Sequence, residues 1–363
     1  MSVWLIVLGS CIVFQTIYLI VLYFTLIGKT KTPDKAPSSI FPKVSIVICS
    51  KNEEFNLKQH LPKIIEQDYP DVEILIVDDG STDNTQAVLQ TFGNKIKTVF
   101  IPSEEKRGLG KKYALLQGIK SANGEIILFT DADCYPASKN WVKEMVAHFN
   151  DKTDIVLGIG LYEKRKGLLN KLIAYETAQT ALQYLGFAAL GNAYMSVGRN
   201  VAYSKDLLQQ LDWSDKDYAI VSGDDDLAIQ QLANKNNVDV CLNPEAFTFS
   251  HPKTTWTSWL KQKSRHTQSS WQYKPSHKLL LFLFGFTKMT IWAITLCLLP
   301  VDFQNVSSFI LLYSLVLLGV YHQLNNHLSL FTRWYFAPIT DFILSFSYLF
   351  IGIKNTFSSS KTW

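Results

Sequence analysis

Cysteine is scarce in this 363-residue chain, and its spacing excludes two kinds of site. There are five cysteines, none has the spacing of a zinc site, and nothing in the pattern suggests a disulfide framework. The absence of disulfides is expected of a domain in a reducing, cytosolic compartment. Two of the five lie in long apolar stretches and three are isolated: Cys11, Cys297, Cys49, Cys134 and Cys241.

Net charge is also low, at +4, in a chain with 47% hydrophobic residues. The sequence contains no nucleic-acid-binding motif, no internal repeat and no low-complexity tract. Its basic excess lies largely next to the apolar stretches, which suits anionic lipid head groups better than nucleic acid. We therefore expect membrane lipids, and no nucleic acid, among the partners.

The stretch Val3–Ile27 has no charged residue at all over 25 positions. About 20 apolar residues are enough to cross the hydrocarbon core of a bilayer. A cleaved signal peptide fits poorly, because no basic residue precedes the stretch, the stretch is too long, and no small-x-small site follows it. The sequence therefore predicts an N-terminal membrane anchor.

Three further apolar stretches lie near the C-terminus: Leu279–Leu299, Val306–Leu324 and Trp334–Ile353. The first contains Lys288, and because a charge inside lipid is costly, we expect it to begin as an interfacial helix and to span only from about Met289. The last contains Pro338 and Asp341, so it is either a span packed on its neighbours or a re-entrant element. The pattern thus predicts three crossings and leaves the fourth open.

Basic residues set the expected orientation. They follow the first stretch and precede the second: Lys29, Lys31, Lys35, Lys261, Lys263, Arg265, Lys274 and Lys278. The positive-inside rule then places the region between the stretches in the cytoplasm. Lys354 and Lys361 would lie outside if the last stretch spans, which is a mild conflict. We expect an integral protein of a bacterial-type inner membrane with a cytoplasmic catalytic domain.

The predicted domains are an N-terminal transmembrane helix (1–28), a linker (29–42), a catalytic domain (43–275) and a C-terminal membrane region with two or three transmembrane or interfacial helices (276–363). Strand-like and helix-like segments alternate in the catalytic domain: Val44–Cys49, Glu54–Gln67, Val72–Val77, Thr82–Phe92, Ile96–Ile101, Leu109–Ser121 and Glu125–Thr130. This alternation is typical of βαβ units and predicts an α/β fold with a parallel sheet. After about Asp151 the rhythm changes and is less readable.

Two carboxylates, Asp131 and Asp133, follow the fourth predicted strand directly. Ligands bind beyond the C-terminal ends of strands in open α/β sheets. Two acids one residue apart on a turn can offer hard oxygens to a divalent cation and to a nucleotide ribose. The alternative is an Asx turn that caps the next helix.

Polar residues also follow the first two strands. Ser50–Glu54 is placed to touch a base or ribose, although helix capping by Asn52 explains it as well. In Val77–Thr85, Gly80 allows a tight turn, but the adjacent acids Asp78 and Asp79 are not needed for capping and suit nucleobase N–H donors.

Two basic segments and one acidic cluster complete the set. Gly108–Ala114 combines flexible backbone with lysines at a helix start, which suits a diphosphate or, alternatively, a solvated basic turn. Ser222–Leu227 places three carboxylates before an expected helix Leu227–Leu232, where one cap would suffice. Crowding and burial raise the pKa of a carboxyl group, which favours a general base. Gln262–His266 is either a site segment or a solvated basic helix face.

The order and spacing of these motifs resemble those of a membrane-bound family 2 glycosyltransferase, a family with processive polysaccharide synthases and lipid-directed members. The similarity covers about residues 43–270 and rests on five segments: Val44–Glu54, Val77–Thr85, Asp131–Asp133, Gly223–Asp226 and Gln262–Arg265. It implies an inverting enzyme with the Rossmann-like GT-A fold, a mixed and mainly parallel sheet flanked by transmembrane helices. It also implies a nucleotide diphosphate sugar donor, UDP-linked in our expectation, and a Mg²⁺ or Mn²⁺ cofactor.

The resemblance assigns the donor site residue by residue. Three residues would bind the base and ribose: Asn52, Glu53 and Asp79. Lys111 would face the diphosphate, Asp131 would lie by the ribose or sugar, and Asp133 would be the metal ligand, with Asp131 as a second candidate.

The family's T-E-D-x-x-L pattern maps onto Ser222–Leu227 and makes Asp224 the catalytic base, while a shift of one residue would choose Asp225. Gln262 would contact the donor and Arg265 the leaving group. Gly198–Tyr203 resembles the segment that lines the sugar and acceptor site.

Two departures from the family pattern matter. The Q-x-x-R-W motif ends here in His266, and the missing tryptophan helps form the acceptor platform of processive members, although Trp271 is an alternative aromatic surface. The glutamate of T-E-D is replaced by Gly223. The replaced glutamate bears on which acid is the base. The altered Q-x-x-R-W motif and the three or four expected spans favour a single transfer to a lipid-linked or membrane-emerging acceptor over a processive synthase with its own channel.

Two other classes of protein are compatible with parts of the pattern. A nucleotidyltransferase would show a glycine- and arginine-rich phosphate loop after the first strand, where this chain has the acidic Ser50–Glu54. A catalytically dead membrane scaffold would have lost Asp133 or the acids 224–226, and all are present. The sequence therefore favours an active transferase.

Overall fold

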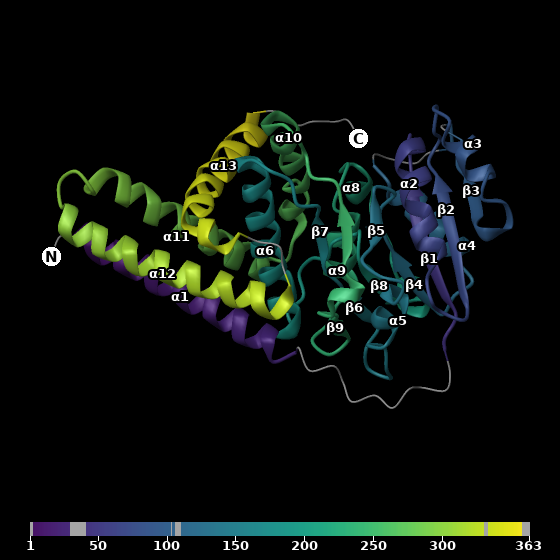
Figure 1. Cartoon of the computed structure of the whole chain (residues 1–363), viewed down its shortest axis with the longest axis horizontal. Helices are drawn as coiled ribbons and strands as arrows, with labels where there is room; N and C mark the ends of the chain where they lie inside the picture. The colour runs from purple at the N-terminus through teal and green to yellow at the C-terminus, as the bar shows by residue number, and fades with distance from the viewer. Residues whose placement is uncertain (1–2, 30–40, 103, 106–109, 330–332, 358–363) are drawn as a thin grey trace. The chain divides into compact units, whose positions relative to one another are not determined.

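The computed structural model describes residues 3–29, 41–102, 104–105, 110–329 and 333–357. Internal contacts divide the chain into two compact units (Figure 1). The helical unit consists of Met1–Gly28, Lys164–Gly186 and Pro252–Ser359. The α/β unit consists of Lys29–Glu163, Phe187–His251 and Ser360–Trp363. Since the sequence boundaries predicted at 28, 42 and 275 are not tested by this division, they stay predictions.

The α/β unit is built on a seven-stranded sheet in the order β3-β2-β1-β4-β8-β6-β9. Strands β1, β2, β3 and β4 pair in parallel, β8 runs antiparallel to β4 and β6, and β6 and β9 are parallel. The sheet is therefore mixed but mainly parallel, as the resemblance implies. Its strands are β1 Val44–Ser50, β2 Val72–Asp78, β3 Lys97–Phe100, β4 Ile126–Phe129, β6 Ile155–Leu157, β8 Val201–Ser204 and β9 Val238–Val240.

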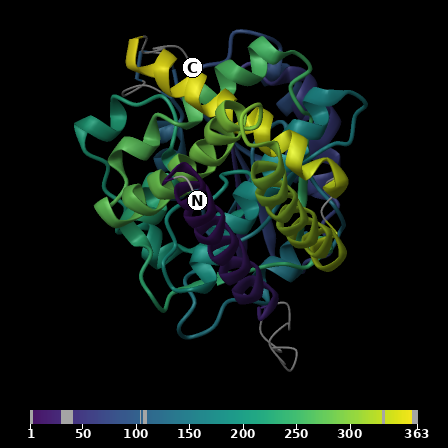
Figure 2. The ribbon, with the colours of Figure 1, turned by 90° about the vertical axis from the view of Figure 1, so that its left-hand side faces the viewer.

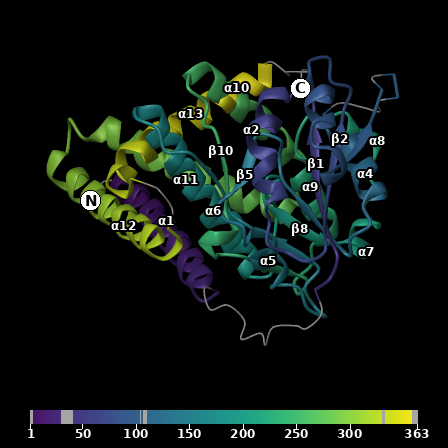
Figure 3. The same ribbon diagram turned by 45° about the vertical axis from the view of Figure 1, so that its right-hand side comes forward.

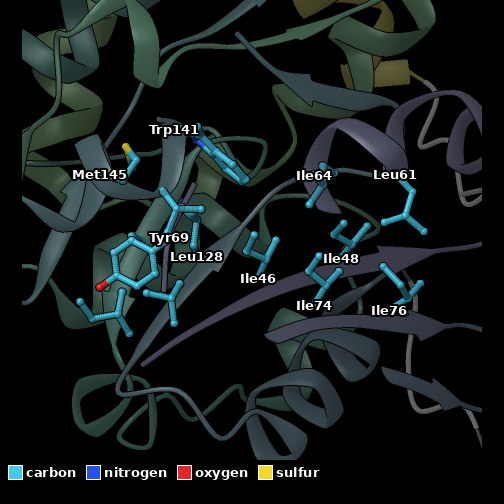
Figure 4. Close-up of a cluster of buried hydrophobic side chains, with 14 of the residues drawn as sticks. Ile46, Ile48, Leu61, Ile64, Tyr69, Ile74, Ile76, Leu128, Trp141 and Met145 are labelled. Atoms are coloured by element: carbon cyan, nitrogen blue, oxygen red, sulfur yellow. The ribbon is translucent and has the colours of Figure 1, made fainter. Parts of the chain in front are cut away.

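Alternation along β1 sends neighbouring side chains to opposite faces of this sheet. Ile46 and Ile48 join a buried cluster under helices α2 and α5, which contribute Leu61 and Trp141 (Figure 4). On the other face, Val47 meets α4 at Gly118, where an added Cβ would lie 2.6 Å from the Val47 side chain. Both faces of the sheet are covered, and Figure 3 shows α2 and α4 beside β1 and β2. This explains why the strands are continuous apolar runs.

A smaller sheet follows the order β5-β10-β7, with β5 at Cys134–Pro136, β7 at Gly160–Tyr162 and β10 at Thr248–Ser250. The helices of the α/β unit are α2 Glu54–Ile65, α3 Thr85–Gln90, α4 Lys112–Ser121, α5 Trp141–Val146, α7 Lys205–Leu208, α8 Asp215–Tyr218 and α9 Asp224–Leu232, with short 3₁₀ turns η1 Gly93–Lys95 and η2 Pro244–Ala246. One prediction was wrong here: the helix expected from Leu227 begins at Asp224, so the three acids form its first turn.

The helical unit holds α1 Val3–Ile27, α6 Leu168–Ala189 as far as Gly186, α10 Trp256–His266, η3 Ser269–Gln272, α11 Pro275–Leu298, α12 Phe303–Leu328, η4 Trp334–Phe336 and α13 Ala337–Phe357. Four helical stretches in the described residues are long and apolar enough to cross a membrane: Val3–Ile27, Pro275–Leu298, Phe303–Leu328 and Trp334–Asn355. The purple α1 packs on α11 and α12, and it can be followed with the yellow α13 in Figure 2.

Lys288 lies inside α11, which continues unbroken on both sides of it. Its ammonium forms an ion pair with Asp341 of α13 at 2.5 Å, and both side chains are buried. The membrane span therefore does not need to begin after Lys288, because the charge that made this position costly is paired inside the unit.

Candidate active site

The acid pair Asp131 and Asp133 sits on a tight turn between β4 and β5. The backbone N–H of Cys134 donates to the Asp131 carbonyl at 3.0 Å, which closes the turn. Strand β5 begins immediately after Asp133, so no helix follows for an Asx turn to cap. The capping interpretation of this pair is therefore wrong, and the two half-buried carboxylates need another explanation.

These carboxylates can hold a divalent cation. Single ligand atoms of Asp131, Asp133 and Cys134 all lie within 4.8 Å of one another. The Cys134 thiol is a soft ligand and contacts Asp133 Oδ1 at 3.3 Å, so the hard oxygens are the groups suited to Mg²⁺ or Mn²⁺. The donor set fits the metal implied by the sequence.

Lys111 connects the acid pair to the second acidic cluster. Its Nζ lies 2.8 Å from Asp131 Oδ1 and 3.3 Å from Asp224 Oδ2. Burial lowers the pKa of Lys111, but Asp131, Asp224 and Asp225 together raise it well above its usual range. The lysine therefore stays charged between two acids that are 93 residues apart in the sequence.

Helix α9 presents the second cluster. Its N-cap, Gly223, has φ 83°, a left-handed conformation that glycine adopts without strain. The acids of the first turn face the positive end of the helix dipole. Asp225 Oδ2 accepts a hydrogen bond from the Gly198 backbone N–H at 2.7 Å. Burial, with Asp226 and Asp224 nearby, raises the pKa of Asp225 well above its usual range.

A pocket in the α/β unit adjoins the second acidic cluster. Its polar wall includes Lys111, Asp224 and Asp225, and its remaining lining residues are Val47, Cys49, Leu115, Phe129, Thr130, Gly198, Val201, Tyr203, Leu208, Leu211 and Ala228. Burial raises the pKa of the Cys49 thiol to about 12, so this sulfur stays protonated and is no nucleophile. The sequence did not single out Leu208 or Leu211, because isolated leucines carry no chemical signal.

The loops after β1 and β2 are bound to each other. Asn52 has φ 56°, and its side-chain oxygen accepts the Thr82 backbone N–H at 2.8 Å. Glu53 is the N-cap residue of α2, and its backbone N–H donates to Thr85 Oγ1 at 2.9 Å. The Asp79 N–H donates to the Ser50 carbonyl at 2.8 Å, and Asp79 is buried. The donor-binding roles of Asn52, Glu53 and Asp79 stay predictions.

Gln262 and Arg265 lie on α10, which belongs to the helical unit, whereas the residues that line the pocket belong to the α/β unit. Their roles at the donor and leaving group therefore stay predictions as well. Gly108 and Leu109 of the predicted phosphate segment lie outside the described residues. Sequence analysis also did not single out Lys112 within the segment interpreted as a diphosphate site or a solvated basic turn, and this lysine is buried.

A Rossmann-like sheet that ends in a pair of metal-compatible acids, beside a second acidic cluster, defines the GT-A class of transferases. Residues 45–212 match the family model described as glycosyl transferase family 2. Residues 45–212 thus carry a glycosyltransferase family 2 domain.

Two curated relatives align over most of the chain. The probable glycosyltransferase YdaM of Bacillus subtilis (strain 168) is 26% identical over 341 residues, which cover 88% of this chain and 75% of that protein. The poly-beta-1,6-N-acetyl-D-glucosamine synthase of Staphylococcus epidermidis is 26% identical over 323 residues, covering 88% and 71%.

One solved structure has the same fold. The mannosyltransferase PcManGT from Pyrobaculum calidifontis, in complex with GDP-Man and Mn²⁺, superposes with a TM-score of 0.60 and 19% identity. The match covers 97% of this chain and 100% of that one. The GT-A fold predicted from the sequence is confirmed.

Proposed function

We propose that the protein transfers a sugar from a nucleotide diphosphate sugar, UDP-linked in our expectation, to a lipid-linked or membrane-associated acceptor with inversion at the anomeric carbon. One observation carries this proposal: the Lys111 ammonium contacts both Asp131 and Asp224, and Lys111 and Asp224 line one pocket. A donor phosphate site and a proton acceptor must be neighbours in such a transfer, because the leaving group and the attacking hydroxyl meet at the same carbon.

Asp224 is the proposed base, with Asp225 as the alternative. Asp224 would accept the proton of the acceptor hydroxyl as its oxygen attacks the anomeric carbon and the bond to the diphosphate breaks. Asp131 and Asp133 would hold Mg²⁺ or Mn²⁺, which when bound supplies positive charge for the diphosphate leaving group. The Lys111 ammonium would add charge at the same place, and Arg265 is proposed to do so from α10.

The donor's base and ribose are proposed to contact Asn52, Glu53 and Asp79, and Gln262 is a further donor contact. Asn52 and Asp79 follow the C-terminal ends of the neighbouring parallel strands β1 and β2. Ligands bind beyond these strand ends in this class of fold. PcManGT was solved with a nucleotide sugar and Mn²⁺, which supports a donor and cofactor of the same type here.

The four apolar helices support a membrane-associated acceptor and an integral membrane location. We propose that the α/β unit faces the cytoplasm, because the basic residues that flank these helices lie next to it in the sequence. A processive synthase is the second candidate, since one relative is named as a polysaccharide synthase. The length of the product formed on a defined primer separates single transfer from polymerisation.

A nucleotide-release assay on detergent-purified protein tests the proposal. A panel of UDP- and GDP-sugars is screened with a lipid extract and Mn²⁺, and Asp133→Ala, Asp224→Asn and Asp225→Asn are compared with wild type. We expect release with one sugar and a loss on the order of 10²–10⁴-fold in Asp224→Asn, the usual contribution of a general base. Asp133→Ala should also abolish release.

The control is Asp151→Asn, which changes an exposed acid of the same unit and should match wild type. Release that survives Asp224→Asn but not Asp225→Asn moves the base by one residue. Folded wild type that neither releases nor binds any nucleotide sugar contradicts the proposal and favours a dead scaffold.

A further inference from the structure

The segment that leads into α9 is held by the start of α4. Lys112 is fully buried, and its Nζ donates to the Ile220 carbonyl at 2.8 Å and to the Ser222 carbonyl at 3.0 Å. Between these two residues, Val221 touches the backbone of Gly110, where an added Cβ would lie 1.9 Å from the Val221 oxygen. Three consecutive residues before the acidic cluster are therefore fixed by Gly110 and Lys112.

These contacts hold the turn that orients the Asp224 side chain. Gly223 follows Ser222 directly and turns the chain with φ 83°, and Asp224 is the next residue. The neighbouring Lys111 binds the Asp224 side chain itself, at 3.3 Å. Two adjacent lysines thus act on the same turn, one on the carboxylate and the other on the backbone that carries it.

We propose that Lys112 is a positioning residue for the transfer reaction, which fixes the backbone of residues 220–223 so that Asp224 meets the acceptor hydroxyl. The inference rests on the proposed function. Lys112 is fully buried, so its side chain would touch no substrate. It acts through Asp224, and its loss should therefore change the rate of the chemical step rather than donor binding.

A lysine suits this place for a physical reason. An ammonium offers three donors, and two carbonyls of one turn converge on it here. Burial lowers the pKa of Lys112, while Asp224, Asp225 and Asp217 oppose that shift. A methionine of similar length would fill the space but leave both carbonyls without this donor, which is costly for buried backbone groups.

The test compares Lys112→Met with Lys112→Arg and with Lys120→Met, an exposed lysine on the same helix. Initial rates are measured with the donor sugar found in the release assay. We expect Lys112→Met to lower kcat at least tenfold while the donor KM and the affinity for the free nucleotide diphosphate change less than twofold. Lys112→Arg should restore part of kcat, and Lys120→Met should match wild type.

A second measurement separates positioning from general damage. In an Asp224→Asn background, Lys112→Met should cause no further loss, because the group it positions is already gone. If Lys112→Met fails to fold, as judged by its thermal melt, Lys112→Gln keeps a shorter donor and should show the same change in kcat alone, smaller in size.

Three results overturn the inference: a kcat equal to wild type in folded Lys112→Met or Lys112→Gln, an equal loss in the Asp224→Asn background, or a loss confined to donor KM. The proposed function fails separately, when wild type itself releases no nucleotide. A wild type that is active and an Asp224→Asn variant that is dead, beside an unaffected Lys112→Met, refute only the positioning role.

Discussion

At the scale of single residues, the chemistry depends on charges that are far apart in the chain. Lys111 reaches Asp131 and Asp224, and Asp225 reaches the backbone of Gly198. The identities of the acids and of Lys111 could be predicted, because acids after strands and lysines at a helix start are recognisable types at recognisable places. The buried role of Lys112 could not, because consecutive lysines at a helix start also fit a solvated turn.

Asp225 makes stability depend on pH. Its folded pKa is raised, so the folded protein keeps this proton at pH values where the unfolded chain has released it. The stabilising contribution is complete below the unfolded pKa and is lost as pH rises through the folded pKa. Asp225→Asn has no proton to lose and still offers an oxygen to Gly198. We expect it to melt higher than wild type at neutral and alkaline pH.

The thermal melt of Asp225→Asn should be measured from pH 5 to pH 9 beside wild type. Each kcal/mol gained would raise the melting temperature by about 2–4 °C in a domain of this size. The gap between the two proteins should widen with pH. A gap that is constant over this range would show that the Asp225 proton plays no part, and Asp151→Asn should show no gap at all.

At the scale of elements, the first four strands were predictable and the later ones were not. Strand β1 is an unbroken β-branched run with polar residues after it, whereas β6, β7, β9 and β10 have three residues each and carry no readable pattern. Helix α6 was also missed, because its apolar residues do not form a single stripe along the helix. The elements packed around α6, rather than the spacing of its own apolar residues, explain why it is buried.

The Glu73 carboxylate links three neighbouring strands of the large sheet. Glu73 on β2 accepts from Ser45 Oγ on β1 at 2.5 Å and from Lys97 Nζ on β3 at 2.6 Å. Its carboxylate also accepts from the backbone of Asn123. Burial raises the pKa of Glu73, but Lys97, Ser45 and Asn123 outweigh burial and lower it to about 2. The contribution to stability is therefore present above the unfolded pKa and is lost as pH falls toward 2.

Glu73→Gln should therefore destabilise the folded protein at pH 7 by on the order of 1–3 kcal/mol, the usual value of a hydrogen bond to a charged group. Denaturant unfolding at pH 7 and at pH 3 measures it, and the difference from wild type should shrink at the lower pH. Glu66→Gln, an exposed acid near the end of α2, is the control. An equal effect of Glu73→Gln at both pH values would contradict the ionic explanation.

At the scale of the whole molecule, the apolar helices contain charged residues. From the sequence alone, each of these residues can be judged only as costly for a membrane span. Lys288 and Asp341 lie in two different apolar stretches of the sequence. The structure pairs them inside the helical unit, where Asp341 also accepts hydrogen bonds from Tyr175, Trp292 and Tyr313. Lys288 donates in addition to Gln179 of α6. One buried cluster thus connects α6, α11, α12 and α13. Local sequence patterns could not predict these contacts, because they join residues far apart in the chain.

This cluster makes a prediction about assembly of the helical unit. Removing one partner leaves a buried charge alone, which in proteins costs about 3–5 kcal/mol, whereas replacing both by apolar residues is often neutral. We expect Lys288→Met and Asp341→Leu each to lower the temperature at which the detergent-purified protein loses its monodisperse elution profile. The double variant should regain most of that loss, because it leaves no unpaired charge.

Lys261→Met, an exposed lysine of the same unit, should behave as wild type. Losses that simply add in the double variant would show that the two charges do not depend on each other, and that the ion pair does not hold these helices together.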